Sequence, residues 1–147
     1  MGKVTASIEI NASPEKVFAF ATDMEKMNDL AKEWTEGKMT SDGPVGLGST
    51  FAHFVGTHKY NKGEEWDAEV TEFTRNKSLT MFLKGANKHS NDQTNYYLFE
   101  TTSKGTKITI TMDYKMNKLL DVLFAHRIID RENRGILEKL KKILEGQ

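Results

Sequence analysis

Residues 117–145 have the sequence NKLLDVLFAHRIIDRENRGILEKLKKILE, and this stretch decides the fold. At 100° per residue, its apolar side chains form a single stripe: Leu119, Val122, Leu123, Ile129, Ile136, Leu137, Leu140, Ile143 and Leu144. The pattern predicts an amphipathic helix of about 28 residues, roughly 42 Å long. In so short a chain, one or two neighbouring helices would not cover such a helix. It therefore needs a broad apolar partner surface.

Most of the sequence before this helix has the period-two alternation of β-strands, beginning with Val4, Ala6, Ile8 and Ile10. Two short helices are predicted next, one entered through Ser13-Pro14 and one over about 24–32. Six further strands are expected at 35–40, 49–57, 65–73, 79–83, 95–102 and 106–116. Most connections between consecutive strands are short, which favours antiparallel pairing.

These elements predict an α+β fold in which a curved, seven-stranded antiparallel sheet is wrapped around the long C-terminal helix. The two short helices would lie between strands 1 and 2. A chain of 147 residues can bury one sizeable core, so we expect a single domain over 1–147.

Composition excludes several function classes. Lys plus Arg number 21 and Asp plus Glu number 21, so the chain lacks the basic field that nucleic-acid binding requires. Without cysteine there is no disulfide, thiolate metal site or Cys nucleophile, and the four histidines lack metal-ligand spacing. We therefore predict no metal and no cofactor. No signal peptide or membrane-spanning segment is legible, so we expect a cytoplasmic protein.

The order of elements and several motifs resemble the START-like superfamily, also called SRPBCC or helix-grip proteins. The matching motifs are IEINASPEKVF (8–18), DGPVGLGSTF (42–51), WDAEVTEF (66–73), KGTKITIT (104–111) and LEKLKKILE (137–145). The resemblance covers essentially the whole chain and is closest to the polyketide cyclase/dehydrase-like branch. It implies a cavity between the sheet and the long helix that holds a hydrophobic small molecule. It also implies that turn 57–64 and loop 84–94 flank the cavity mouth.

Polar residues interrupt the stripe of the long helix at His126 and Asn133, which are seven positions apart and are both expected to face the sheet. A polar group on such a face costs about 1–3 kcal/mol unless it finds a hydrogen-bond partner. A ligand is one such partner. A water, a strand hydroxyl, or Asp130 pairing with His126 at i,i+4 is another.

On the sheet, Trp66 lies on the apolar face of its strand. In the third strand, residue parity leaves open which face points inward, and aromatic spacing favours Phe51 and His53. The same ambiguity holds for Tyr96 against Tyr97. The predicted ligand-binding residues are Phe51, His53, Trp66, Tyr96, Met112, Tyr114, His126, Ile129 and Asn133.

Three functions fit these features. The first is binding or transport of a hydrophobic small molecule such as a lipid, an isoprenoid or an aromatic polyketide, by a monomer or weak homodimer. The second is a polyketide cyclase or dehydratase in which His126, with Asp130, is the candidate acid or base. The third is a protein-partner module that resembles a chaperone cofactor. The sequence leaves open whether the protein is an enzyme.

Overall fold

The computed structural model describes residues 2–42, 45–47, 51–115 and 119–146, apart from the side chains of residues 51 and 119–122. Within this part of the chain there are seven strands and three helices. In chain order they are β1 (Gly2–Ile10), α1 (Pro14–Ala21), α2 (Met24–Ala31), β2 (Thr35–Met39), β3 (Phe51–Gly56), β4 (Glu65–Thr74), β5 (Ser78–Gly85), β6 (Gln93–Thr102), β7 (Gly105–Tyr114) and α3 (Leu119–Glu145). The order of elements confirms the prediction.

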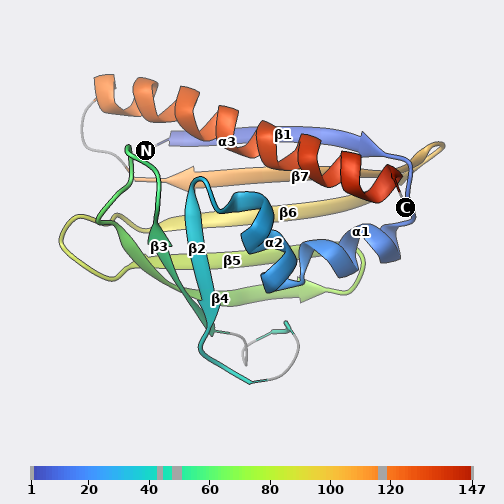
Figure 1. The fold of residues 1–147 in the computed structure, drawn as a ribbon, viewed down its shortest axis with the longest axis horizontal. Helices are drawn as coiled ribbons and strands as arrows, with labels where there is room; N and C mark the ends of the chain where they lie inside the picture. The colour runs from blue at the N-terminus through green and yellow to red at the C-terminus, as the bar shows by residue number, and fades with distance from the viewer. Residues whose placement is uncertain (1, 43–44, 48–50, 116–118, 147) are drawn as a thin grey trace.

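The strands form one antiparallel sheet in the order β1-β7-β6-β5-β4-β3-β2. The sheet curves, and α3 lies along β1 and β7 while α1 and α2 extend the helical cover over the same face (Figure 1). This is the predicted grip of a curved sheet on a long helix.

The short helices begin where the sequence signals predict. The Ser13 side chain accepts a hydrogen bond of 3.3 Å from the Lys16 backbone N–H, and Pro14 occupies the first turn of α1. The Asp23 carboxylate caps α2 in the same way, accepting from the Lys26 N–H at 3.2 Å.

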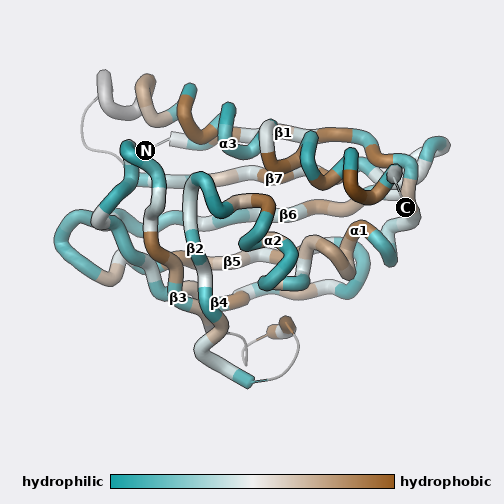
Figure 2. Tube along the Cα trace, in the orientation of Figure 1, coloured by the Kyte–Doolittle hydropathy of each residue, from teal (hydrophilic) through white to brown (hydrophobic). Residues whose placement is uncertain are grey.

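The main core fills one end of the molecule. Hydrophobic residues recur along α3 (Figure 2), and those of its C-terminal half pack against the sheet and α1. Members of this core include Ile10, Val17, Phe18, Phe99, Ile108, Leu137, Leu140 and Leu144. The N-terminal half of α3 differs, because Leu123 and Phe124 are more than half exposed. Because these side chains do not fill the interior, space for a cavity is left at that end of the sheet.

The structure settles which face of β3 points inward, and our expectation for His53 was wrong. Ala52 pairs with Ala68 and Phe54 pairs with Trp66, so these residues share the inner face. His53 alternates to the outer face. The side chain of Phe51, the other residue expected inside, lies outside the described residues.

The same correction applies to Tyr96 in β6. Tyr97 pairs with Ile110 and Phe99 with Ile108, which places Tyr97 and Phe99 against the core. Tyr96 lies on the opposite face and is 41 % exposed.

Candidate functional site

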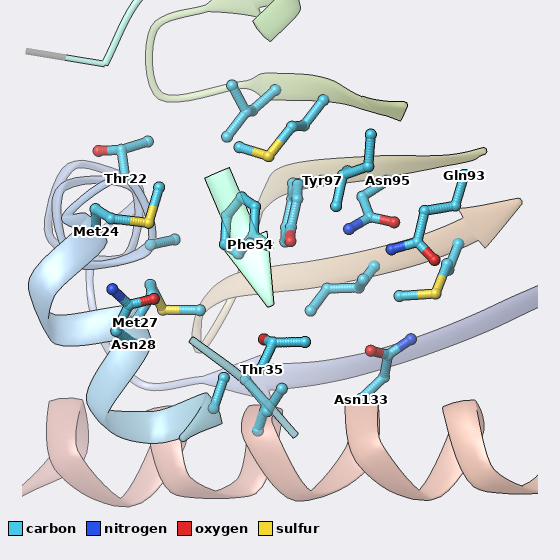
Figure 3. Close-up of a pocket in the computed structure, with 18 of the residues that line it drawn as sticks. Thr22, Met24, Met27, Asn28, Thr35, Phe54, Gln93, Asn95, Tyr97 and Asn133 are labelled. Atoms are coloured by element: carbon cyan, nitrogen blue, oxygen red, sulfur yellow. The ribbon is translucent and has the colours of Figure 1, made fainter. Parts of the chain in front are cut away.

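A cavity between the sheet and the helices has two adjoining chambers. The first has a volume of about 120 Å³ and lies among α2, α3 and the inner face of the sheet. Its apolar lining includes Met24, Met27, Phe54, Leu79, Met81 and Ile136. Figure 3 shows methionine, aromatic and amide side chains converging on this space.

The second chamber, with a volume of about 210 Å³, lies toward the N-terminal half of α3. It shares Thr35, Trp66, Gln93, Met112 and Glu132 with the first chamber, so the two are neighbouring parts of one cavity. Their combined volume lies just above the lower end of the range of about 300–1,000 Å³ that is typical of small-molecule sites.

Two loops contribute to the second chamber. Tyr60 and Glu64 come from the β3–β4 connection and Asn91 from the β5–β6 connection. The loops lie at the same end of the sheet (Figure 1), and Asn87 Nδ2 donates a hydrogen bond of 2.9 Å to the Gly63 carbonyl between them. The loops predicted to flank the cavity thus lie together beside it.

Two asparagines in the first chamber have unmet hydrogen-bonding capacity among the described residues. Asn133 on α3 is 3 % exposed and its Nδ2 has no partner, while Oδ1 of the buried Asn95 on β6 also has none. By contrast, Asn28 uses both ends of its amide. It donates to the Gly37 carbonyl and accepts from the Gly37 N–H at 3.1 Å. An unsatisfied buried polar group costs about 1–3 kcal/mol, so the free amides point to a ligand as their partner.

A carboxyl group lies where the chambers meet. Glu132 lines both, and burial raises the pKa of its carboxyl to about 7. In the second chamber, burial also raises the pKa of Glu64 to about 7. Burial raises the pKa of the Tyr97 hydroxyl, with the Asn95 amide opposing this shift and the Glu132 carboxylate adding to it. Glu132 and Tyr97 both line the first chamber, so the charge of the carboxyl acts on the hydroxyl.

Five of the predicted ligand-binding residues meet at this cavity. Trp66 and Met112 line both chambers, Tyr114 and Ile129 line the second, and Asn133 lines the first. The Trp66 indole is fixed by a hydrogen bond of 3.0 Å from Nε1 to the Asn91 carbonyl. Tyr96 and His53 lie outside the cavity, as their strand faces require.

The predicted role of His126 meets two corrections. His126 is exposed. Asp130 pairs with Arg134 instead of His126, because Arg134 Nε donates to both Asp130 carboxylate oxygens at 3.0 and 2.9 Å. The reason is that different sides of α3 face the interior in its two halves. In the N-terminal half, Phe124, Ala125, Ile128 and Ile129 line the cavity, and His126 lies on another side of the helix. In the C-terminal half, the side that carries Asn133 faces the sheet.

Sequence reasoning missed Glu132, Glu64, Gln93 and Asn95, and it named Tyr97 only as the alternative to Tyr96. One signal for Glu132 was present, because it lies between Ile128 and Ile136 at successive steps of four residues. Positions four apart share a helix face, so a carboxyl there is flanked by two inward isoleucines. The polar residues of β6 gave no comparable signal.

No group of three or more His, Asp or Glu side chains suitable for a metal ion occurs among the residues with described placement. In that same part of the chain, no helix combines the length and apolar character needed to cross a membrane.

The grip of the curved sheet on the long helix and the cavity between them define a helix-grip protein of the START-like class. The family model for polyketide cyclase/dehydrase and lipid transport proteins matches residues 1–145, and the chain belongs to this family. Membership and fold together indicate hydrophobic ligand binding or a cyclase-like role. No curated protein sequence matches the chain.

Solved structures share the fold at low sequence identity. TTHA0849 from Thermus thermophilus is 20 % identical with a TM-score of 0.76, covering 95 % of this chain and 94 % of that one. MLL2253 from Mesorhizobium loti is 17 % identical with a TM-score of 0.74, covering 99 % and 98 %. The Aha1 dimer from Colwellia psychrerythraea is 21 % identical with a TM-score of 0.67, covering 99 % and 97 %.

Proposed function

We propose that this protein binds or transports a hydrophobic small molecule, such as a lipid, an isoprenoid or an aromatic polyketide, in the two-chambered cavity. The observation that carries the proposal is the combination of apolar walls with two unpartnered polar atoms, Asn95 Oδ1 and Asn133 Nδ2. Apolar walls supply affinity, and a few converging polar groups orient a ligand.

The polar atoms specify how a ligand would sit in the first chamber. A carbonyl or ether oxygen would accept from Asn133 Nδ2, and a hydroxyl would donate to Asn95 Oδ1. The flexible thioethers of Met24, Met27 and Met81 adapt to different apolar bodies. The site therefore suits an amphipathic molecule with a largely hydrocarbon body.

A thermal-shift panel of fatty acids, isoprenoids, flavonoids and short polyketides tests the proposal. A ligand at 100 times its dissociation constant adds about 2.7 kcal/mol, roughly 5–11 °C for a domain of this size. The shift should be lost in Trp66→Ala and Asn133→Leu and retained in Tyr96→Phe, which changes the outer face of β6. A flat panel across all classes would contradict the proposal.

A cyclase- or dehydratase-like enzyme is the alternative, and Glu132 is the observation that favours it. A carboxyl with a pKa near neutrality is suited to transferring protons, and this one lines the same chamber as Tyr97. Glu132→Gln should then lower turnover of a poly-keto substrate by about 10²–10⁴-fold while binding persists. His126→Ala, on the exposed side of α3, should leave turnover unchanged. Full activity of Glu132→Gln would exclude this role.

The quaternary state and location are part of the same proposal. We propose a cytoplasmic monomer or weak homodimer, although the Colwellia neighbour forms a dimer. A partner-binding module is the second alternative, supported by the exposed Leu123 and Phe124 on α3. Light scattering coupled to gel filtration measures the molar mass in solution and thus tests the quaternary state. Loss of a captured partner in Phe124→Ser would support the second alternative.

A further inference from the structure

We propose that the second chamber binds an organic cation, so that the ligand is a hydrophobic amine with its ammonium group held among aromatic rings and carboxylates. This inference rests on the proposed function, because it specifies the ligand chemistry of the same cavity.

The first support is the aromatic lining. Five aromatic side chains line the chamber, namely Trp34, Tyr60, Trp66, Tyr114 and Phe124. Aromatic faces attract cations through their quadrupole, and tryptophan and tyrosine do so more strongly than aliphatic walls. A purely hydrocarbon ligand would not need this concentration of rings.

The rings are held in place by one another. Trp34 stacks on His58 with centroids 4.1 Å apart, and His58 stacks on Tyr60 at 5.0 Å. Tyr60 then meets the edge of Phe124 at 5.4 Å, which joins the β3–β4 loop to α3. The aromatic wall is therefore preorganised across two elements, which lowers the entropic cost of binding.

The second support is a pair of carboxyl groups on different elements. Glu64 precedes β4 and Glu132 lies on α3, and both line this chamber. Neither side chain has an ion pair or hydrogen bond within the described residues. Both carboxyl groups are partly buried, and ionising a partly desolvated carboxyl without a partner is costly, so a bound cation would compensate both.

Lys59 Nζ lies over the Tyr60 ring, 5.0 Å from its centroid, but within the described residues it forms no ion pair with Glu64 or Glu132. Besides the two glutamates, the described lining contains only Tyr60, Tyr114 and Lys115 as titratable residues. Lys115 is exposed and forms no ion pair with either carboxyl. Asn95 Oδ1 and Asn133 Nδ2, which are unpartnered in the adjoining chamber, independently indicate that a ligand completes this interior. A polar group at the far end of its hydrophobic body would reach them while its ammonium group occupies the second chamber.

The two carboxyl groups in the second chamber also disfavour one class of ligand. A fatty acid or other carboxylate would place a third negative group beside Glu64 and Glu132, and like charges at short range are strongly unfavourable. A hydrophobic amine is favoured over an alcohol of the same shape, and the alcohol over the acid.

This order of affinities can be tested with three probes that share a phenylbutyl group, namely phenylbutylamine, phenylbutanol and phenylbutyrate. Each is titrated calorimetrically at about pH 8, where both glutamates are ionised. We expect the amine to bind at least about tenfold more tightly than the alcohol, with the acid weakest. The Glu64→Gln/Glu132→Gln double variant should lose the preference for the amine and retain binding of the alcohol. Glu138→Gln, a matched change at an exposed position of α3, should retain the preference.

The outcomes separate this inference from the proposed function. If the alcohol binds as tightly as the amine, the cation site is wrong and the hydrophobic cavity stands. If the amine preference survives in the double variant, the assignment to Glu64 and Glu132 is wrong. Binding by none of the three overturns the cation site, and with a flat thermal-shift panel it also overturns the proposed function.

Discussion

His53 lies against Asp67 on the outer face of the sheet, with His53 Nδ1 2.8 Å from Asp67 Oδ1, and its Nε2 is 3.1 Å from Glu65 Oε1. Hydrogen bonds to Asp67 and then Glu65 raise the pKa of His53 above its usual value of 6.5. Folding therefore favours the protonated imidazole. The resulting stabilisation is fully present below the unfolded pKa and is lost as the pH rises through the folded pKa.

We therefore expect His53→Gln to lower the free energy of unfolding at about pH 5.5 and to change it little at about pH 9. Because the His53 side chain is 34 % exposed, solvent screening keeps the difference below about 1 kcal/mol. Urea midpoints at a series of pH values measure it. His89→Gln, at an exposed position, supplies the matched control for the loss of a histidine. An offset for His53→Gln that is equal at all pH values would contradict the expectation.

Glu132 should make the folded protein less stable as the pH rises, whereas a carboxylate with a lowered pKa makes it more stable. Its pKa is raised from 4.5 to about 7 by burial, so the folded state holds a proton that the unfolded chain releases. Stability consequently falls as the pH rises from about 4.5 to about 7 and stays low above that range. Glu132→Gln should raise the unfolding free energy by about 1–3 kcal/mol at pH 8 and by little at pH 4.5.

Denaturant unfolding of wild type and Glu132→Gln at these two pH values measures this effect. Glu138→Gln supplies the control, because that side chain is exposed on the same helix. A Glu132→Gln variant that is less stable than wild type at both pH values would show that the carboxylate has a stabilising partner, contrary to the structure.

Much of the fold was predictable because its signals are local and periodic. The apolar stripe of α3 and the alternation in β1, β4 and β7 identify each element without reference to the rest of the chain. Ser13 and Pro14 mark the start of α1 through their own backbone chemistry. Short connections then leave antiparallel pairing as the favoured arrangement.

The site was less predictable because it depends on relations between elements. In β3 and β6, aromatic residues occur on both faces, so alternation alone could not tell Phe54 from His53 or Tyr97 from Tyr96. The inward face is decided only by strand pairing, in which Phe54 lies opposite Trp66 and Tyr97 lies opposite Ile110. On α3, helical spacing correctly placed Asn133 inside, but it could not show that the cavity wall changes face near His126.

The two tyrosines of β6 provide a matched test of the inward face. Tyr97 lines the first chamber together with Asn95 and Glu132, whereas Tyr96 is exposed on the other face. Tyr97→Phe should change the affinity of a bound ligand by about 0.5–1.5 kcal/mol, the net value of one hydrogen bond. Tyr96→Phe should leave affinity unchanged in the same titration. Equal effects of the two changes would contradict this assignment of faces.

Asn133 and Asn28 both line the first chamber, and replacing each with leucine should have opposite effects on the stability of the ligand-free protein. Asn133→Leu removes an unpartnered buried amide and should raise the unfolding free energy by about 1 kcal/mol. Asn28→Leu leaves the Gly37 N–H and carbonyl without their partner and should lower it by about 1–3 kcal/mol. Thermal and urea unfolding measure both changes. A less stable Asn133→Leu would show that Asn133 Nδ2 already has a hydrogen-bond partner in the ligand-free protein, so that no ligand is needed to supply one.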